Sequence, residues 1–186
     1  MKLWSDSWTN GDRIPERHAA GRPDGAGAAP FSDNLNPHLA WSDVPAAAKS
    51  MVLICHDFDV PSRGDDVNKP DREVPSDLPR VDFFHWVMVD IPAHLTQLAE
   101  GEYSRGFTPR GKPGPAVQGV PGAEAARHGL NDYTNWFAGH ATMAGPYMIM
   151  ASAPAISGRA RNTQPVSTSL PMTTPTTKAT AGFTNE

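Results

Sequence analysis

The sequence is poor in the features that mark many classes of protein. It has a single cysteine, Cys55, in 186 residues, so no disulfide can form within the chain and nothing demands an oxidising compartment. No stretch approaches 18 apolar residues, and the N-terminus lacks the apolar segment of a signal peptide. We therefore expect a cytoplasmic protein without an integral membrane segment.

Basic patches and catalytic motifs are also missing. The net charge is -4 and the 16 Lys and Arg residues are scattered, so we expect no nucleic-acid partner. G-x-S-x-G, H-E-x-x-H and C-x-x-C do not occur. Residues 106–112, GFTPRGK, begin like a phosphate loop, but Pro113 stands where Ser or Thr must bind magnesium. The sequence thus predicts no cofactor.

Helical periodicity is scarce, whereas two runs are typical of β-strands. With 19 Pro and 16 Gly in the chain, only residues 45–50 and 124–130 look briefly helical. Residues 50–59 and 81–92 are rich in β-branched and aromatic side chains and are followed or closed by proline. We predict one mainly β domain in which these two strands are central.

Polar residues stand at the ends of both strands. Alternation places Asp57 on the face of Leu53 and Cys55, and it divides the second run into two faces. These two faces are Val81, Phe83, His85, Val87, Val89 and Ile91 on one side, and Phe84, Trp86 and Met88 on the other. Residues 61–80 form a connection too long and polar for an ordinary hairpin turn, and loops of that length usually serve a site.

If the two strands are close in one sheet, Asp57, Asp59 and His85 point to one side. A carboxylate that accepts from one imidazole nitrogen fixes the tautomer and leaves the other N–H aimed outward, ready for an anion such as phosphate. The residues leave two alternatives open. His85 could be a satisfied core histidine beside a turn shaped by the aspartates, or His56 could join these three residues as metal ligands.

Four linked segments resemble the phosphatidylethanolamine-binding protein family, in its bacterial Raf-kinase-inhibitor-like branch. They are NPHLAWSDVP (36–45), HDFDVPS (56–62), FFHWVMVDIP (83–92) and GLNDYTNWFAG (129–139). The resemblance covers about the first 145 residues. It implies a mainly β fold with a large antiparallel sheet, a smaller sheet and few short helices.

The resemblance also implies a site and a function. The family's D-P-D-x-P motif corresponds to residues 57–61 and its H-W pair to His85 and Trp86. The ligand-binding residues implied or predicted in this way are Asp57, Asp59, Val60, Pro61, His85 and Trp86. The family's activity implies non-enzymatic binding of a phospholipid headgroup, nucleotide or phosphorylated group, and modulation of a protein kinase or protease. The protein could also form a homodimer, which the resemblance does not decide.

The chain departs from the family pattern at two places. Phe58 replaces the usual proline of D-P-D-x-P, which puts the aim of Asp59 in question. Residues 146–186 form a tail rich in Thr, Ser and Pro, predicted to be mobile, in place of the family's Gly-Pro-x-Pro-Pro loop and His-Arg-Tyr strand. Our hypothesis is that a frameshift near Gly145 created this tail. Codons for Tyr147 to Met150, read in one shifted frame, permit family-like residues.

Two other functions remain as alternatives. A hydrolase could use Asp57 and His85 as an acid and base pair, although no motif supplies its nucleophile. The chain could also be a degraded family member that binds nothing, because the tail removes pocket motifs that the resemblance would require.

Overall fold

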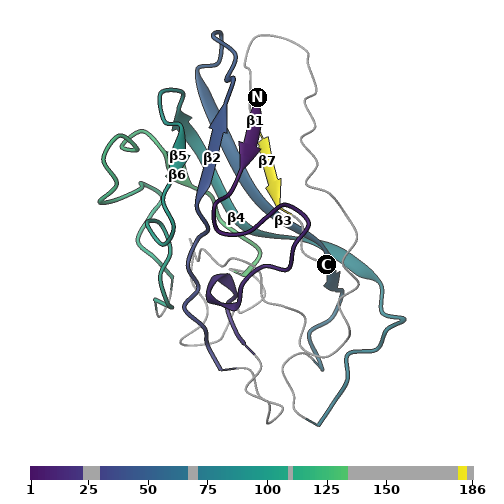
Figure 1. The fold of residues 1–186 in the computed structure, drawn as a ribbon. Helices are drawn as coiled ribbons and strands as arrows, with labels where there is room; N and C mark the ends of the chain where they lie inside the picture. The colour runs from purple at the N-terminus through teal and green to yellow at the C-terminus, as the bar shows by residue number, and fades with distance from the viewer. Residues whose placement is uncertain (23–29, 67–70, 109–110, 134–179, 184–186) are drawn as a thin grey trace.

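The computed structural model describes residues 1–22, 30–66, 71–108, 111–133 and 180–183 (Figure 1). Its two longest elements are β3, Ser50–Pro61, and β4, Arg80–Pro92. They pair antiparallel, and the long connection expected between them joins their ends. The two predicted strands are therefore confirmed, and each extends by one or two residues.

The strands form two sheets (Figure 1). The larger has the order β6-β4-β3-β7 and the smaller β1-β2-β5. All pairs are antiparallel except β3 and β7, which run parallel. The remaining elements are β1 (Lys2–Trp4), the 3-10 helix η1 (Glu16–His18), β2 (Leu39–Ser42), β5 (Gln97–Leu98), β6 (Arg127–His128) and β7 (Thr180–Phe183). The predicted mainly β class, with β3 and β4 central, is confirmed.

The main core is built from both sheets. Strands of the larger sheet supply Met51, Leu53, Trp86, Met88 and Ile91, and the smaller sheet supplies Leu39, Trp41 and Leu98. Met88, Ile91 and Leu98 are at most 1% exposed. Because apolar area removed from water is the main source of stability, this shared cluster holds the two sheets together.

The sequence predicted the wrong face of the second strand for Ile91. That residue was expected opposite Trp86 and Met88, yet all three pack in the main core. The cause is a register shift: Met51 pairs with Ile91 but Leu53 pairs with Met88, so β4 has an extra residue there. Asp90 lies in this bulge with a φ of 55°, and an extra residue reverses the alternation beyond it.

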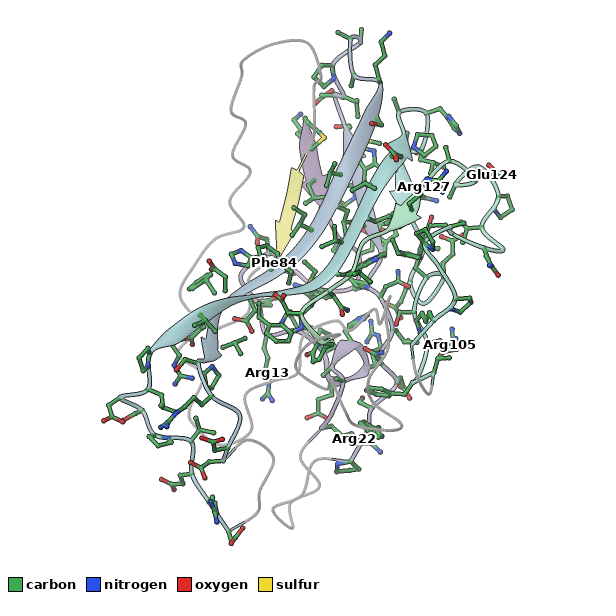
Figure 2. The ribbon with its side chains drawn as sticks, turned by 180° about the vertical axis from the view of Figure 1, so that it is seen from behind. Arg13, Arg22, Phe84, Arg105, Glu124 and Arg127 are labelled. Atoms are coloured by element: carbon green, nitrogen blue, oxygen red, sulfur yellow. The ribbon has the colours of Figure 1, made fainter. Side chains whose placement is uncertain are left out.

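Neither briefly helical segment forms a helix. Residues 45–48 make a turn closed by the Ala48 N–H donating to the Pro45 carbonyl at 2.8 Å. In the other segment Arg127, labelled in Figure 2, and His128 form β6. Short alanine-rich stretches cannot offset the cost of helix nucleation, and pairing with β4 satisfies the backbone of β6 instead.

The tail contributes one described element. Thr180–Phe183 forms β7 beside β3, so the expectation of a mobile tail does not hold for these four residues. The expected boundary near residue 145, the frameshift hypothesis and residues 134–139 of the fourth family-like segment concern residues outside the described ranges. Among the described residues, no helix is long and apolar enough to span a membrane.

Candidate functional site

The candidate site forms where β3 and β4 lie side by side. His85 Nε2 is 3.6 Å from Asp57 Oδ2, and the two side chains are 3% and 12% exposed. Asp57 comes from β3 and His85 from β4, so 28 positions of sequence separate two groups that meet in space. The structure therefore brings together the acid and the imidazole that the sequence predicted on one side of the sheet.

A second register shift makes this meeting possible. Cys55 pairs with Trp86 and His56 with Phe84, which leaves His85 as an extra residue on β4. In an unbroken register His85 would lie directly opposite His56. Because directly opposed residues share a face and neighbours along a strand do not, Asp57 would then lie on the other face from His85.

A hydrogen bond from the residue two positions along the chain holds the Asp57 carboxylate in place. Its Oδ1 accepts a hydrogen bond from the backbone N–H of Asp59 at 2.8 Å, the local bond that aspartate often makes two residues along the chain. The register shift between Asp57 and Val60 accommodates this turn. Phe58, which stands in place of the family's proline, is 38% exposed and does not prevent it.

The carboxylate of Asp59 contacts the neighbouring strand. Its Oδ1 lies 3.5 Å from Arg80 Nε, and the two side chains are 49% and 34% exposed. This contact ties the end of β3 to the start of β4. An exposed ion pair of this kind contributes at most about 1 kcal/mol, so its main effect is to balance the charge of Asp59.

Tyr133 completes the surroundings of His85 and was not predicted as a site residue. Its hydroxyl lies 3.1 Å from His85 Nδ1, and its ring meets Phe83 edge-on at 4.7 Å. The expectation that one N–H of His85 would aim outward is therefore wrong for Nδ1, which is engaged inside the protein. The structural cause is the approach of residues 131–133 to β4.

Hydrogen bonds between two side chains and the backbone of β4 hold residues 131–133 against that strand. The Asn131 amide donates to the His85 carbonyl at 2.9 Å, and Asp132 Oδ2 accepts from the Phe84 N–H at 2.7 Å. The only sequence signal for this docking was two hydrogen-bonding side chains directly before an aromatic residue in a family-like segment. Nothing local in that segment shows which strand it joins.

The remaining hydrogen-bonding capacity of the site lies at His85 Nε2. This atom is buried and makes no hydrogen bond with the described part of the chain, because 3.6 Å to Asp57 is too long for one. Burial raises the pKa of Tyr133, so its phenol stays protonated and can donate to Nδ1. The neutral ring then carries its proton on Nε2, facing a carboxylate that can only accept.

Val60, Pro61 and Trp86 have different positions relative to this pair. Val60 packs beside Phe83 and Tyr133 in a small second cluster, and Pro61 ends β3. Trp86 lies in the main core, where its indole N–H donates to His128 Nδ1 at 3.2 Å. The structure thus places Val60 near the pair and Trp86 in the cluster between the sheets.

His56 belongs to a separate, exposed pair. Its Nε2 lies 2.9 Å from Asp82, and its ring stacks on Phe84, labelled in Figure 2, with centroids 4.8 Å apart. It therefore does not join Asp57 and His85. Within the described ranges, no three His, Cys, Asp or Glu side chains are grouped so that they could hold a metal ion.

Comparison with known proteins gives consistent matches. The family model described as phosphatidylethanolamine-binding protein matches residues 4–155. UPF0098 protein YbhB of Escherichia coli (strain K12) is 36% identical over 101 residues, which is 54% of this chain and 50% of that protein. A UPF0098 protein of Aquifex aeolicus is 28% identical over 133 residues, 72% of this chain and 53% of that protein.

The solved structure of Escherichia coli YbcL, described as a new member of the mammalian PEBP family, matches at a TM-score of 0.44 and 22% identity. The match covers 82% of this chain and 66% of that one. The chain spans about half the length of the curated relatives it matches. Since the family model covers most of its residues, the chain belongs to the phosphatidylethanolamine-binding protein family.

Proposed function

We propose that this protein is a non-enzymatic binding module that takes phosphate-like anions at the Asp57–His85 pair. The observation that carries the proposal is the buried Nε2 of His85, which has no hydrogen-bond partner within the described ranges. A buried donor without a partner costs roughly 1–3 kcal/mol, and a ligand oxygen would recover that cost. When His85 is protonated, the ring also offers the anion a positive charge.

The expected affinity follows from the small number of donors. A phosphate monoester carries a charge of about -1.5 to -2 at neutral pH and strong acceptor oxygens. Each charge-assisted hydrogen bond contributes about 1.5–3 kcal/mol. Two such bonds correspond to dissociation constants from millimolar to tens of micromolar, in order of magnitude.

The ligand could reach the site as a phospholipid headgroup, a nucleotide or a phosphorylated side chain. The last case supports the finer proposal that the protein modulates a protein kinase or protease by holding a phosphorylated partner. Val60 and Pro61 would form an apolar wall beside the anion, whereas Trp86 would hold β4 from within the core. The single, half-buried Cys55 fits the proposed cytoplasmic location.

Binding is better supported than hydrolysis. A hydrolase that works through a covalent intermediate needs a protein nucleophile activated by a base such as the imidazole. The hydroxyl that touches His85 is the Tyr133 phenol, and burial raises its pKa, so it is a poor nucleophile at neutral pH. We therefore expect no turnover of generic phosphoesters, with or without divalent ions, by a preparation that binds phosphate.

Titration calorimetry with inorganic phosphate tests the proposal. His85→Gln should lower the phosphate affinity by about tenfold or more, because the glutamine amide can donate a hydrogen bond but cannot carry a positive charge. The matched control is His56→Gln, which removes the exposed histidine paired with Asp82 across the same two strands and should leave the affinity unchanged. Equal phosphate affinity of wild-type protein and His85→Gln would contradict a receptor at this pair.

A further inference from the structure

We propose that the Asp57–His85 site selects phosphate groups that carry a proton. Its ligands would be inorganic phosphate and the protonated form of phosphate monoesters, in preference to sulfate and to phosphodiesters. The inference rests on the proposed function, since it concerns the same pair, and it narrows that function to one chemical class.

The Asp57–His85 pair offers one hydrogen-bond donor beside one acceptor. Oδ1 of Asp57 is already occupied by the Asp59 N–H, which leaves Oδ2 beside His85 Nε2 at 3.6 Å. A ligand oxygen that accepts from Nε2–H therefore brings a second ligand oxygen within reach of Oδ2. Because a carboxylate accepts only, that second oxygen must be a hydroxyl to be bound rather than repelled.

The charges around the pair also favour a ligand that carries a proton. Asp59 is paired with Arg80, and the charge of Asp57 is matched only when His85 is protonated. Among the described residues, the charged and titratable groups that contact the pair or its immediate neighbours include Asp59, Arg80, Tyr133, Cys55 and Asp132. They supply no surplus positive charge. A bare dianion would therefore face an uncompensated carboxylate.

The presence of a P–OH group therefore sets the order in which the site should bind simple anions. Both neutral-range forms of inorganic phosphate keep at least one P–OH group. A monoester has one only below its second pKa, about 6. Sulfate and a phosphodiester have none near neutral pH. The phosphate of an intact phospholipid headgroup is a diester, so a free monoester should be the better ligand.

Calorimetry with the full chain at about pH 7 provides the main test. Inorganic phosphate should bind about tenfold or more tightly than sulfate at matched ionic strength, which corresponds to one charge-assisted hydrogen bond. Asp57→Asn should reduce this preference to about twofold, because the amide can donate to sulfate while its oxygen still accepts the Asp59 N–H. Asp82→Asn, in the exposed pair, should keep the full preference.

A second measurement needs no variant. It compares a free phosphate monoester with the phosphodiester that a phospholipid headgroup contains. Phosphoethanolamine is a monoester, and glycerophosphoethanolamine is the diester with the same headgroup. The monoester should bind more tightly than the diester at about pH 5.5. Its affinity relative to inorganic phosphate should rise as the pH is lowered from about 7.5, because the monoester gains a P–OH group that inorganic phosphate already has.

The outcomes distinguish the inference from the proposed function. Equal affinity of wild-type protein for phosphate and sulfate would overturn proton selection while leaving anion binding in place. Equal affinity for monoester and diester at low pH would overturn it as well. If neither phosphate nor sulfate binds, the proposed function itself fails, and the inference fails with it.

Discussion

Each ring nitrogen of His85 faces a different kind of group. Nδ1 lies 3.1 Å from the Tyr133 hydroxyl, and Nε2 lies 3.6 Å from the Asp57 carboxylate. A phenol can donate or accept, whereas a carboxylate only accepts, so the neutral ring is favoured with its proton on Nε2. Tyr133 is thus a positioning residue for the donor that would meet the ligand.

Tyr133→Phe should weaken phosphate binding severalfold while largely preserving the fold. The substitution removes the hydroxyl but keeps the ring that packs edge-on against Phe83. Loss of one buried hydrogen bond should lower the free energy of unfolding by about 1 kcal/mol. Calorimetry and urea unfolding measure the two effects.

Tyr103→Phe is the matched control for this prediction. Tyr103 is a second buried tyrosine, in the main core, and burial also raises the pKa of its phenol. Its substitution should leave phosphate affinity unchanged. A similar loss of affinity in both variants would mean that Tyr133 acts through general stability and not through the His85 ring.

At the scale of elements, residues 129–133 act as a strap along β4. The Gly129 N–H donates to the Val87 carbonyl at 2.9 Å, and the Asn131 amide donates to the His85 carbonyl. A Cβ on Gly129 would lie 2.9 Å from Val87 Cγ1 and 3.1 Å from Val87 Cβ. Valine is stiff at χ1, so it cannot easily move aside.

Gly129→Ala should therefore lower the free energy of unfolding by about 1–3 kcal/mol and also weaken phosphate binding, because it pushes the strap and Tyr133 away from β4. The test is urea unfolding together with calorimetry. Adding Val87→Ala removes the crowding methyl groups and should restore part of the phosphate affinity. If the single variant binds and unfolds like the wild type, the strap does not position the site.

At the scale of the whole molecule, His128 links pH to stability. Burial, and secondarily the positive charge of Lys112, lowers the pKa of His128 from 6.5 to about 4. The Trp86 indole N–H, which can only donate, meets His128 Nδ1 at 3.2 Å and so requires an unprotonated Nδ1. The folded protein therefore holds this ring neutral in a contact that reaches the main core.

The sign of the resulting pH dependence follows from proton uptake. Between about pH 6.5 and 4 the unfolded chain binds a proton at this position that the folded chain does not. The stabilising contribution is complete above about pH 6.5 and is lost as the pH falls toward 4, by up to about 3 kcal/mol. Burial lowers the pKa of His18 too, which adds to the effect in the same direction.

In urea unfolding monitored by tryptophan fluorescence, the urea concentration at the midpoint should fall steadily from about pH 7 to pH 4. His128→Gln should flatten part of this slope, because its amide oxygen can accept the Trp86 N–H without titrating. The residual slope should reflect His18 and acidic groups. An unchanged slope in His128→Gln would show that His128 does not hold its ring neutral in the fold.

Much of the site was predictable because strand character and turn chemistry are local. Runs of β-branched and aromatic residues predicted β3 and β4, and their polar ends predicted Asp57 and His85 as a pair. The same alternation misplaced Ile91, because a bulge is an effect of pairing with the neighbouring strand. Tyr133 was missed because its role depends on docking to a strand far away in sequence.

The sequence by itself determined the class of fold, the two central strands and the chemical character of the site, since each depends on the side chains of a short segment. Only the tertiary structure decided that Asp57 and His85 share a face, that Tyr133 occupies Nδ1 and that His56 stands apart with Asp82. The physical reason is register. One extra residue in β4 moves a side chain to the other side of the sheet, and no local pattern records which residue of the partner strand it will oppose.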